Sequence, residues 1–131
     1  MSEKVNLERA FASFDEAWRP RIAAELNGQE VKLVKLRGAF EWHHHEDEDE
    51  LFLVVKGRLR MELRDGDVVL EEGEMLVVPR GVEHRPVAEE EAQVLLFEPA
   101  GTVNTGNLRN ERTAEPERLR ADTMGSGGPE G

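Results

Sequence analysis

The stretch Trp42-His43-His44-His45 is followed, after four intervening residues, by Glu50 and the apolar run Leu51–Val55. A second stretch further along the chain reads Pro79-Arg80-Gly81-Val82-Glu83-His84. Imidazole and carboxylate groups are the ligands that borderline and hard divalent metal ions prefer in proteins. Strand-like runs surround both stretches, so strands can bring these groups together. We therefore predict a metal centre inside a small β-structure.

Short strand-like runs alternate with turn signals from Gly38 to Phe97. Leu51–Val55 is apolar on both faces, which is typical of a buried strand, whereas Leu59–Leu63 alternates apolar with charged residues. The remaining runs are Val68–Leu70, Met75–Val78 and Val94–Phe97. Many short strands without an intervening helix predict an all-β sandwich or barrel. The acidic residues 89–91 are expected to form a turn that faces water.

The residues before Gly38 predict a helix and a hairpin. Residues 6–18 form an amphipathic pattern with apolar residues at helical spacing, which Asn6 can cap and Pro20 ends. Asn27-Gly28 favours a tight turn between Ile22–Leu26 and Val31–Leu36. We expect an N-terminal helical segment over residues 1–19, a β-barrel over 20–100, and a C-terminal extension over 101–131. That extension would include a helical turn at 113–120 and a flexible tail at 125–131.

Side chains alternate along a strand, so His43 and His45 would point to one face and His44 to the other. The acidic residues 46–49 would bulge into solvent, and Glu50 would re-enter the fold beside His84. A second arrangement stays open, because Phe40 and Trp42 fall on the same face as His44. If these apolar side chains face the core, His44 points inward and His43 and His45 point outward. The first arrangement requires that both faces are covered, with Phe40 and Trp42 packed against the N-terminal segment or a partner subunit.

The two stretches resemble the paired motifs of the cupin superfamily, in particular its small single-domain bacterial members. The first motif has Gly38, His43-x-His45, Glu50 and Gly57, and it is one residue shorter than usual before the first histidine. The second has Gly73, Pro79-x-Gly81 and His84, with Ala88 where the family often has asparagine. The resemblance covers residues 38–88 and is specific, because the glycine, histidine, glutamate and proline positions of both motifs agree together.

The resemblance implies a fold and a ligand set. The fold would be a double-stranded β-helix, also called a jelly roll or cupin barrel, with the short helix before it. The metal ligands would be His43, His45, Glu50 and His84, around a divalent ion such as zinc, manganese, iron or nickel. Four protein ligands would leave positions open on the ion for a small-molecule substrate.

Composition excludes several classes of protein. The 131 residues carry a net charge of −11, which would repel nucleic acids and anionic membranes. The absence of cysteine excludes disulfides and thiolate chemistry. No apolar run approaches the roughly 18 residues that span a bilayer, and the N-terminus does not read as a signal peptide, so a cytoplasmic location is expected. We also expect a homodimer in which the hairpin Ile22–Leu36 pairs with a neighbouring chain.

Two functional hypotheses follow from these residues. The first is a metal-dependent cupin that acts on a small molecule as an oxygenase, isomerase or lyase. The second is a non-catalytic module that binds or senses a ligand or metal. No catalytic residue is identified. Glu41 shares parity with His43 and His45, so it is a candidate for a partner of the ligands or a general base, but a rim carboxylate exposed to water is favoured. Leu59, Met61, Leu63 and part of Val94–Phe97 are candidates for an apolar pocket wall. A solvated histidine loop that binds metal nonspecifically is the alternative to both.

Overall fold

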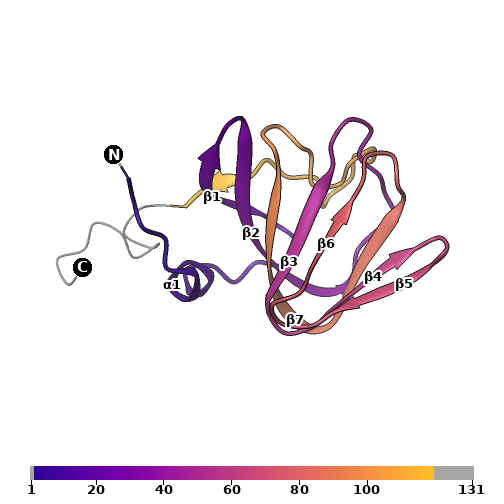
Figure 1. Ribbon diagram of the computed structural model, residues 1–131, viewed down its shortest axis with the longest axis horizontal. Coiled ribbons are helices and arrows are strands. Elements are labelled where there is room, and N and C mark those ends of the chain that lie inside the picture. The colour runs from indigo at the N-terminus through magenta and orange to yellow at the C-terminus, as the bar shows by residue number, and fades with distance from the viewer. Residues whose placement is uncertain (1, 120–131) are drawn as a thin grey trace.

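The computed structural model describes residues 2–119, which form a short helix followed by strands (Figure 1). Apart from its N-terminal helix, this part of the chain is built from β-strands, as the strand-like runs predict. The bounds are α1 Leu7–Ala12, β1 Arg21–Leu26, β2 Gln29–Ala39, β3 Glu50–Lys56, β4 Leu59–Leu63, β5 Gly66–Leu70, β6 Met75–Val78, β7 His84–Pro99 and β8 Glu117–Arg118.

β7 is the element that joins the two sheets. Its first half pairs with β4, and its second half pairs with β3 on one side and β2 on the other. Leu36 of β2 pairs with Ala92, but Gly38 pairs with Ala88, so residues 89–91 face a single residue of β2. Such a bulge bends a strand and re-aims it. The turn predicted at 89–91 is therefore wrong: these exposed glutamates lie within β7.

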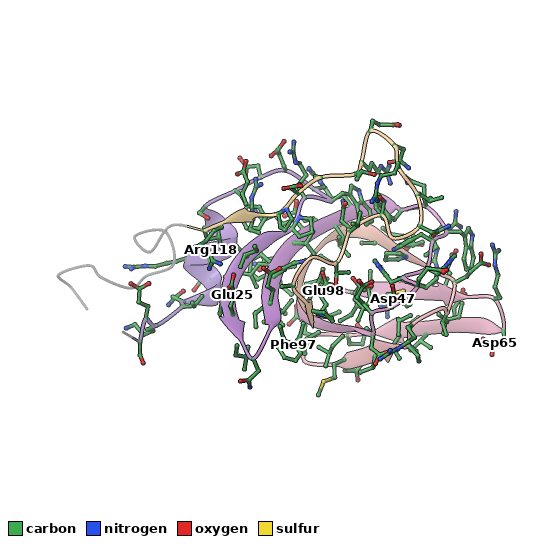
Figure 2. The ribbon with its side chains drawn as sticks, turned by 90° about the horizontal axis from the view of Figure 1, so that it is seen from above. Glu25, Asp47, Asp65, Phe97, Glu98 and Arg118 are labelled. Atoms are coloured by element: carbon green, nitrogen blue, oxygen red, sulfur yellow. The ribbon has the colours of Figure 1, made fainter. Side chains whose placement is uncertain are left out.

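The bend in β7 produces two packed sheets, as expected for a jelly roll. One contains β6, β3, the second half of β7, β2, β1 and β8, and the other contains β5, β4 and the first half of β7. Phe52, Val54, Leu59, Met61 and Val94 are among the buried residues between them. Over residues 2–119 the strand order is open: β6 is an edge beside β3, and the longest path of paired strands has β5 and β8 at its ends. Figure 2 shows these ends far apart, with Arg118 near β1 and Asp65 in the β4–β5 turn.

The N-terminal helix is shorter than predicted. α1 ends at Ala12, and its start is capped by the Asn6 side chain, which accepts a hydrogen bond from the Arg9 amide at 2.9 Å. Residues 13–20 lie outside the helix, and Ala17 and Trp18 reach β2: Ala17 forms a parallel bridge with Lys35, and the Trp18 amide donates to the Lys35 carbonyl at 2.8 Å. Trp18 has a φ of 68°, which a helix does not permit. Pairing with β2 therefore overrides helical spacing after residue 12.

α1 lies on the outer face of the β2–β7 sheet. Phe11 and Phe14 pack there with Leu33 of β2, and Leu95 of β7 borders the cluster. This outer cluster is separate from the core between the sheets, which contains Val34 and Leu36. β2 is therefore covered on both faces, which is why its middle residues, 32–36, form a continuous buried run.

The hairpin predicted at Asn27-Gly28 is confirmed. β1 and β2 pair in antiparallel register from Leu26 and Gln29, and both turn residues have positive φ, as a tight hairpin turn requires. The helical turn predicted at 113–120 is wrong, because Glu117 and Arg118 form β8, which pairs in parallel with β1. Pro116 lies directly before β8 and disfavours a helix there. The tail predicted at 125–131 lies outside the described residues.

Helices long and apolar enough to cross a membrane are absent from residues 2–119.

Candidate metal centre

The backbone places His43 opposite His84. Beyond β2, residues 40–43 continue alongside the start of β7, where the Phe40 amide donates to the Pro86 carbonyl at 3.0 Å. His43 and His84 then form an antiparallel bridge, with amide-to-carbonyl distances of 3.0 and 2.9 Å. The two imidazole rings lie with centroids 4.3 Å apart. Strand pairing therefore brings together two histidines that are 41 residues apart in sequence.

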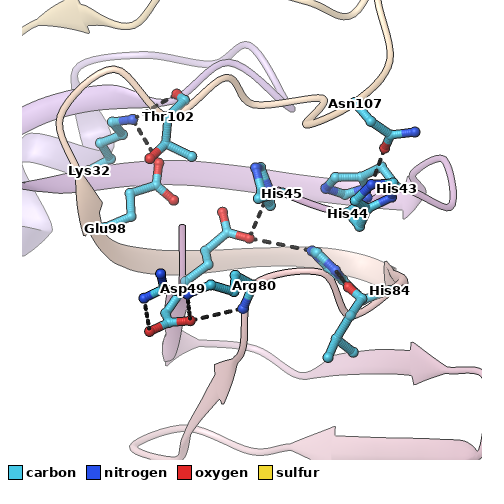
Figure 3. Close-up of polar contacts among 12 residues, drawn as sticks. Lys32, His43, His44, His45, Asp49, Arg80, His84, Glu98, Thr102 and Asn107 are labelled. Atoms are coloured by element: carbon cyan, nitrogen blue, oxygen red, sulfur yellow. Dashed lines mark hydrogen bonds and ion pairs between the residues drawn. The ribbon is translucent and has the colours of Figure 1, made fainter. Parts of the chain in front are cut away.

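The turn in the second motif supports the remaining two residues. The Gly81 amide donates to the His45 carbonyl at 2.7 Å, and Asp49 accepts from the Arg80 amide at 2.8 Å and from its guanidinium. Glu50 begins β3 and pairs with Val78 at the end of β6. The acidic segment 46–49 is mostly exposed, as predicted, while the residues on either side of it turn inward. The two motifs are thus joined by direct contacts (Figure 3).

The four predicted ligands converge in the interior. Their exposed fractions are at most 5%, and their candidate ligand atoms all lie within 4.8 Å of one another. The Glu50 Oε1 atom lies 3.3 Å from His45 Nε2 and 3.4 Å from His84 Nε2. Ligand atoms that share one ion at 2.0–2.2 Å are separated from each other by roughly 3–4 Å. The spacing of His43, His45, Glu50 and His84 therefore fits a single cation.

Backbone carbonyls orient two of the imidazoles. His43 Nδ1 lies 2.9 Å from the Glu41 carbonyl, and His84 Nδ1 lies 2.9 Å from the Val82 carbonyl. A carbonyl only accepts, so each Nδ1 donates its hydrogen and each Nε2 keeps a free lone pair. This is how proteins fix the tautomer of a metal-ligating histidine.

The inward-facing atoms of the cluster have no aligned hydrogen-bond partner. Three atoms are buried without a hydrogen bond: His45 Nε2, His84 Nε2 and Glu50 Oε1. Buried polar atoms without partners are rare in proteins, and here three of them face one another. Two imidazole lone pairs and a carboxylate oxygen are the donor set that a divalent cation satisfies. The residues present therefore fit a bound metal ion.

The protonation states of His43 and Glu50 also suit a bound metal ion. Burial, followed by the neighbouring His84, lowers the pKa of His43 to about 4, so this imidazole is neutral near pH 7. Burial acts to raise the pKa of Glu50, but contacts with His45 and His84 hold it well below its ordinary value. The neutral imidazole of His43 and the ionised carboxylate of Glu50 are the forms that bind a metal.

The question of which histidines face inward has a clear answer. His43 and His45 are buried, whereas the His44 side chain is about a quarter exposed. Phe40 is buried as well, stacked on Trp18 of the N-terminal segment with ring centroids 4.8 Å apart. Trp42 is half-buried, and the Arg64 guanidinium lies 3.8 Å above its ring. The N-terminal segment therefore covers Phe40, as one of the two alternatives in the sequence analysis requires.

A pocket of about 40 Å³ adjoins the cluster. His43 and Glu50 form part of its wall, and most of the rest is apolar, from Trp18, Pro20, Val34, Leu36, Phe40, Phe52, Pro86 and Leu96. The predicted wall is correct for Leu96 but wrong for Leu59, Met61 and Leu63. Leu59 and Met61 are fully buried in the core between the sheets, and Leu63 packs against that core. Inward parity alone does not tell a pocket wall from a packed core.

Glu41 does not point its carboxylate at the cluster. Its Oε2 lies 3.2 Å from Arg112 Nη1, and Asn110 donates to its other carboxylate oxygen. Only the backbone carbonyl of Glu41 reaches His43. Glu41 is thus a half-buried rim residue.

Two features near the cluster were not predicted from the sequence. The first is Glu98, which is buried and lines the pocket, with Lys32 Nζ 2.7 Å from its Oε2. Burial and the neighbouring Glu50 carboxylate raise the pKa of Glu98 well above its ordinary value, while Lys32 acts to lower it. The signal was present, because Glu98 shares strand parity with the buried residues Val94 and Leu96.

The second feature is the loop that follows β7. The Asn107 amide donates to the His44 carbonyl at 2.9 Å, and the Asn107 side chain accepts from the His44 amide at 2.9 Å. Gly106 lies so close that a Cβ there would be 2.2 Å from the His44 carbonyl oxygen. No periodicity in residues 101–114 indicates that this loop holds the histidine segment.

Comparisons with known proteins agree with this fold and site. Residues 29–98 match the family described as the cupin domain. A solved cupin-2 domain protein from Shewanella frigidimarina is 45% identical with a TM-score of 0.72, over 72% of this chain and 93% of that one. Protein NMB1881 from Neisseria meningitidis is 36% identical with a TM-score of 0.69, over 75% of this chain and 100% of that one. The uncharacterised protein YdbB of Bacillus subtilis is 40% identical over 86 residues, which are 65% of this chain and 76% of YdbB.

The matched region extends from the start of β2 to Glu98 near the end of β7, so it contains β2 to β6, nearly all of β7 and all four clustered residues. It covers more than half of the chain. This protein belongs to the cupin family.

Proposed function

We propose that this protein is a metal-dependent cupin that acts on a small molecule by oxygenase, isomerase or lyase chemistry, with His43, His45, Glu50 and His84 as the metal ligands. The observation that carries the proposal is the convergence of these four buried side chains within 4.8 Å, with unpartnered atoms turned toward one another. The cupin fold supports it, since the family match includes every member of the cluster.

The chain supplies the surroundings in which such chemistry would take place. A bound divalent ion would provide a Lewis acid or, if redox-active, an electron carrier. The Glu41 and Val82 carbonyls hold two imidazoles in the tautomer that exposes Nε2. The apolar walls of the adjoining pocket, including Phe40 and Phe52, keep bulk water from its interior.

Metal content of three histidine variants tests the ligand set. His45→Gln and His84→Gln should each lower the affinity for the metal at least tenfold, since each variant removes one buried ligand. Each variant should therefore retain less metal than the wild type after dialysis. His44→Gln is the matched control, because His44 is adjacent in sequence but points away from the cluster. Elemental analysis after dialysis gives the stoichiometry. Full metal content in both ligand variants, or equal loss in all three, would refute the site.

The identity of the metal decides the class of chemistry. Zinc would restrict the protein to Lewis-acid reactions, whereas iron, manganese or nickel would also permit redox reactions. Elemental analysis of protein purified without added metal separates these cases.

A non-catalytic binding or sensing module is the second candidate. The same cluster and adjoining pocket would also hold a metal and a ligand without turnover. Thermal stabilisation of the metal-loaded protein by a compound that is recovered chemically unchanged would support this alternative. Turnover of the same compound would support the enzyme.

The cytoplasmic location and the homodimer expected from the sequence are likewise proposals. The edge of β1 is partly occupied by β8, which leaves less of the hairpin free for a neighbour than the sequence suggests. An apolar surface elsewhere supports self-association better. On the outer face of β6 and β3, Met75 is 64% and Val77 is 51% exposed, and they pair with the partly buried Leu53 and Leu51.

A further inference from the structure

We propose that the divalent ion reaches the metal centre through an acidic cavity beside His45, where the carboxylates of Glu46 and Glu48 collect the cation before the ligands take it. This inference rests on the proposed function, because it concerns how the same four ligands acquire their ion. It assigns a role to two acidic residues that the ligand set does not use.

An entering ion must pass through protein, because the cluster is closed off from solvent. Each of the four ligands is at most 5% exposed, and the atoms that face the centre, such as His84 Nε2 and Glu50 Oε1, are buried. Two cavities adjoin the cluster, and they share no lining residue. These cavities are the two candidate entrances.

The pocket of about 40 Å³ is a poor entrance for a cation. His43 and Glu50 form part of its wall, but most of the remainder is apolar, including the rings of Trp18, Phe40 and Phe52. A divalent ion travels with bound water, and apolar walls offer nothing to replace the water that it must shed. This side therefore suits a small molecule better than a hydrated ion.

The acidic cavity has the polar wall that a cation requires. Its volume is about 160 Å³, and it is lined by His45, Glu46, Glu48, Val103, Gly106 and Asn107. The carboxylates of Glu46 and Glu48 accept no hydrogen bond from residues 2–119, and the nearest ring nitrogen, His44 Nε2, lies 3.8 Å from Glu46 Oε1. Asp49, in the same segment, is by contrast engaged by Arg80. Two carboxylates of the segment thus remain available to a cation.

His45 connects the acidic cavity with the cluster. It lines the cavity, and its Nε2 lies 3.3 Å from Glu50 Oε1. The residue is 3% exposed, yet its Nδ1 stays accessible to solvent and has no hydrogen-bond partner among residues 2–119. The Nδ1 atoms of His43 and His84 are each held by a backbone carbonyl. His45 is therefore the ligand whose ring can turn to admit an ion, while the Gly81 amide keeps its backbone in place.

Collection of the ion by carboxylates would act mainly on the rate of metal uptake. A hydrated cation is attracted by negative charge before it loses any water, so its concentration rises beside His45. A cavity lined by one sign of charge raises association rates by roughly 10–1000-fold, and salt weakens the effect. Glu46 and Glu48 lie outside the ligand set, so the number of ions bound at saturation should not depend on them.

The association rate of Zn²⁺ tests this route. Metal-free protein is mixed with Zn²⁺ in a stopped-flow instrument, and a weak, rapidly exchanging coloured indicator reports the free ion. In the double variant Glu46→Gln/Glu48→Gln, the association rate constant should fall at least fivefold at about 0.1 M salt. At about 1 M salt the difference should shrink to less than twofold, because the Debye length is then about 3 Å.

Glu89→Gln/Glu90→Gln is the matched control, because it removes the same charge from two exposed residues of β7. A rise of about 3.3 Å per residue places these residues roughly 15–20 Å along the strand from His84. That separation exceeds the Debye length of about 10 Å at 0.1 M salt. This variant should therefore take up Zn²⁺ at the wild-type rate.

Four outcomes would overturn the inference: an unchanged rate in Glu46→Gln/Glu48→Gln, an equal fall in Glu89→Gln/Glu90→Gln, a difference that persists at high salt, or a lower stoichiometry of Zn²⁺ at saturation. Stoichiometry of the wild-type protein separates this failure from that of the proposed function. Wild-type protein that binds Zn²⁺ without a difference in rate between the variants rejects only the route, whereas wild-type protein that binds no Zn²⁺ rejects the proposed ligand set.

Discussion

At the scale of single residues, the candidate site depends on backbone atoms as well as on side chains. Each of two histidines donates from Nδ1 to the carbonyl two residues before it, His43 to Glu41 and His84 to Val82. The same local arrangement thus recurs in two segments that pair with each other. It determines the tautomer without any partner from another part of the chain, so substitution of the Glu41 side chain should leave the orientation of His43 intact.

Gly106 is expected to be needed for the histidine segment to keep its position. Gly106→Ala should lower the free energy of unfolding by about 2–4 kcal/mol, because the new Cβ would meet the His44 carbonyl and because φ is +60°. Gly101→Ala is the control, since φ there is also positive but a Cβ would meet nothing within 4 Å; its cost should be about 1–2 kcal/mol. Urea denaturation measures both. Equal costs would mean that the loop simply moves aside.

The clustering of His43, His45, Glu50 and His84 could be predicted from the sequence, whereas the surroundings of the cluster could not. The spacing of the two motifs points to these four residues, although strand parity alone left open whether His44 faces inward in place of His43 and His45. Gly106 and Asn107 were not predictable, because a loop without periodicity carries no signal of what it contacts. Glu98 is an intermediate case, since its inward parity was visible but its partner Lys32 lies 66 residues away.

At the scale of elements, strand pairing decides most of the architecture. β2 and β7 are the longest strands, and their pairing continues past the bulge into the segment that carries His43. Single-sequence patterns located most strands, including Met75–Val78 with the correct bounds. These patterns failed where the structure depends on a partner distant in sequence. β7 extends through three glutamates, and the chain leaves α1 early because Ala17 and Trp18 bond to Lys35 of β2.

Phe11 should hold α1 on the sheet without affecting the metal centre. Phe11→Ala should cost about 3–5 kcal/mol of stability, because Phe11 is fully buried against Leu33 and its neighbours. Metal stoichiometry should stay at the wild-type value, since α1 lies on the outer face and the cluster lies inside. Leu7→Ala in the same helix is the control and should cost clearly less, because Leu7 is only partly buried. A loss of metal in folded Phe11→Ala would contradict this separation of the two faces.

At the scale of the whole molecule, charge and apolar surface act against each other. The net charge of −11 opposes association of two copies, but an uncharged patch remains on the outer face of β6 and β3. Across the strands, Val77 pairs with Leu51, which pairs with Phe97, so this row is apolar from one strand to the next. Burial of such a row would offset the electrostatic cost at moderate salt.

Sedimentation of two valine variants tests the proposed homodimer. Val77→Lys should weaken association at least tenfold, because it places a charge in the centre of the patch. Val69→Lys is the control: Val69 is similarly exposed, at 46%, but lies on β5 in the other sheet, so this variant should associate like the wild type. A wild-type protein that sediments as a monomer at micromolar concentration would exclude the dimer.

The stacking of Trp18 on Phe40 gives the molecule an intrinsic optical reporter. The chain has two tryptophans and no tyrosine, so its ultraviolet-excited emission comes from two indoles. Trp42 sits beneath Arg64, whereas Trp18 forms part of the pocket wall. A Trp42→Phe protein would therefore carry one fluorophore, beside the histidine cluster. Quenching or a spectral shift of that single emission would register whatever enters the pocket, with no label attached.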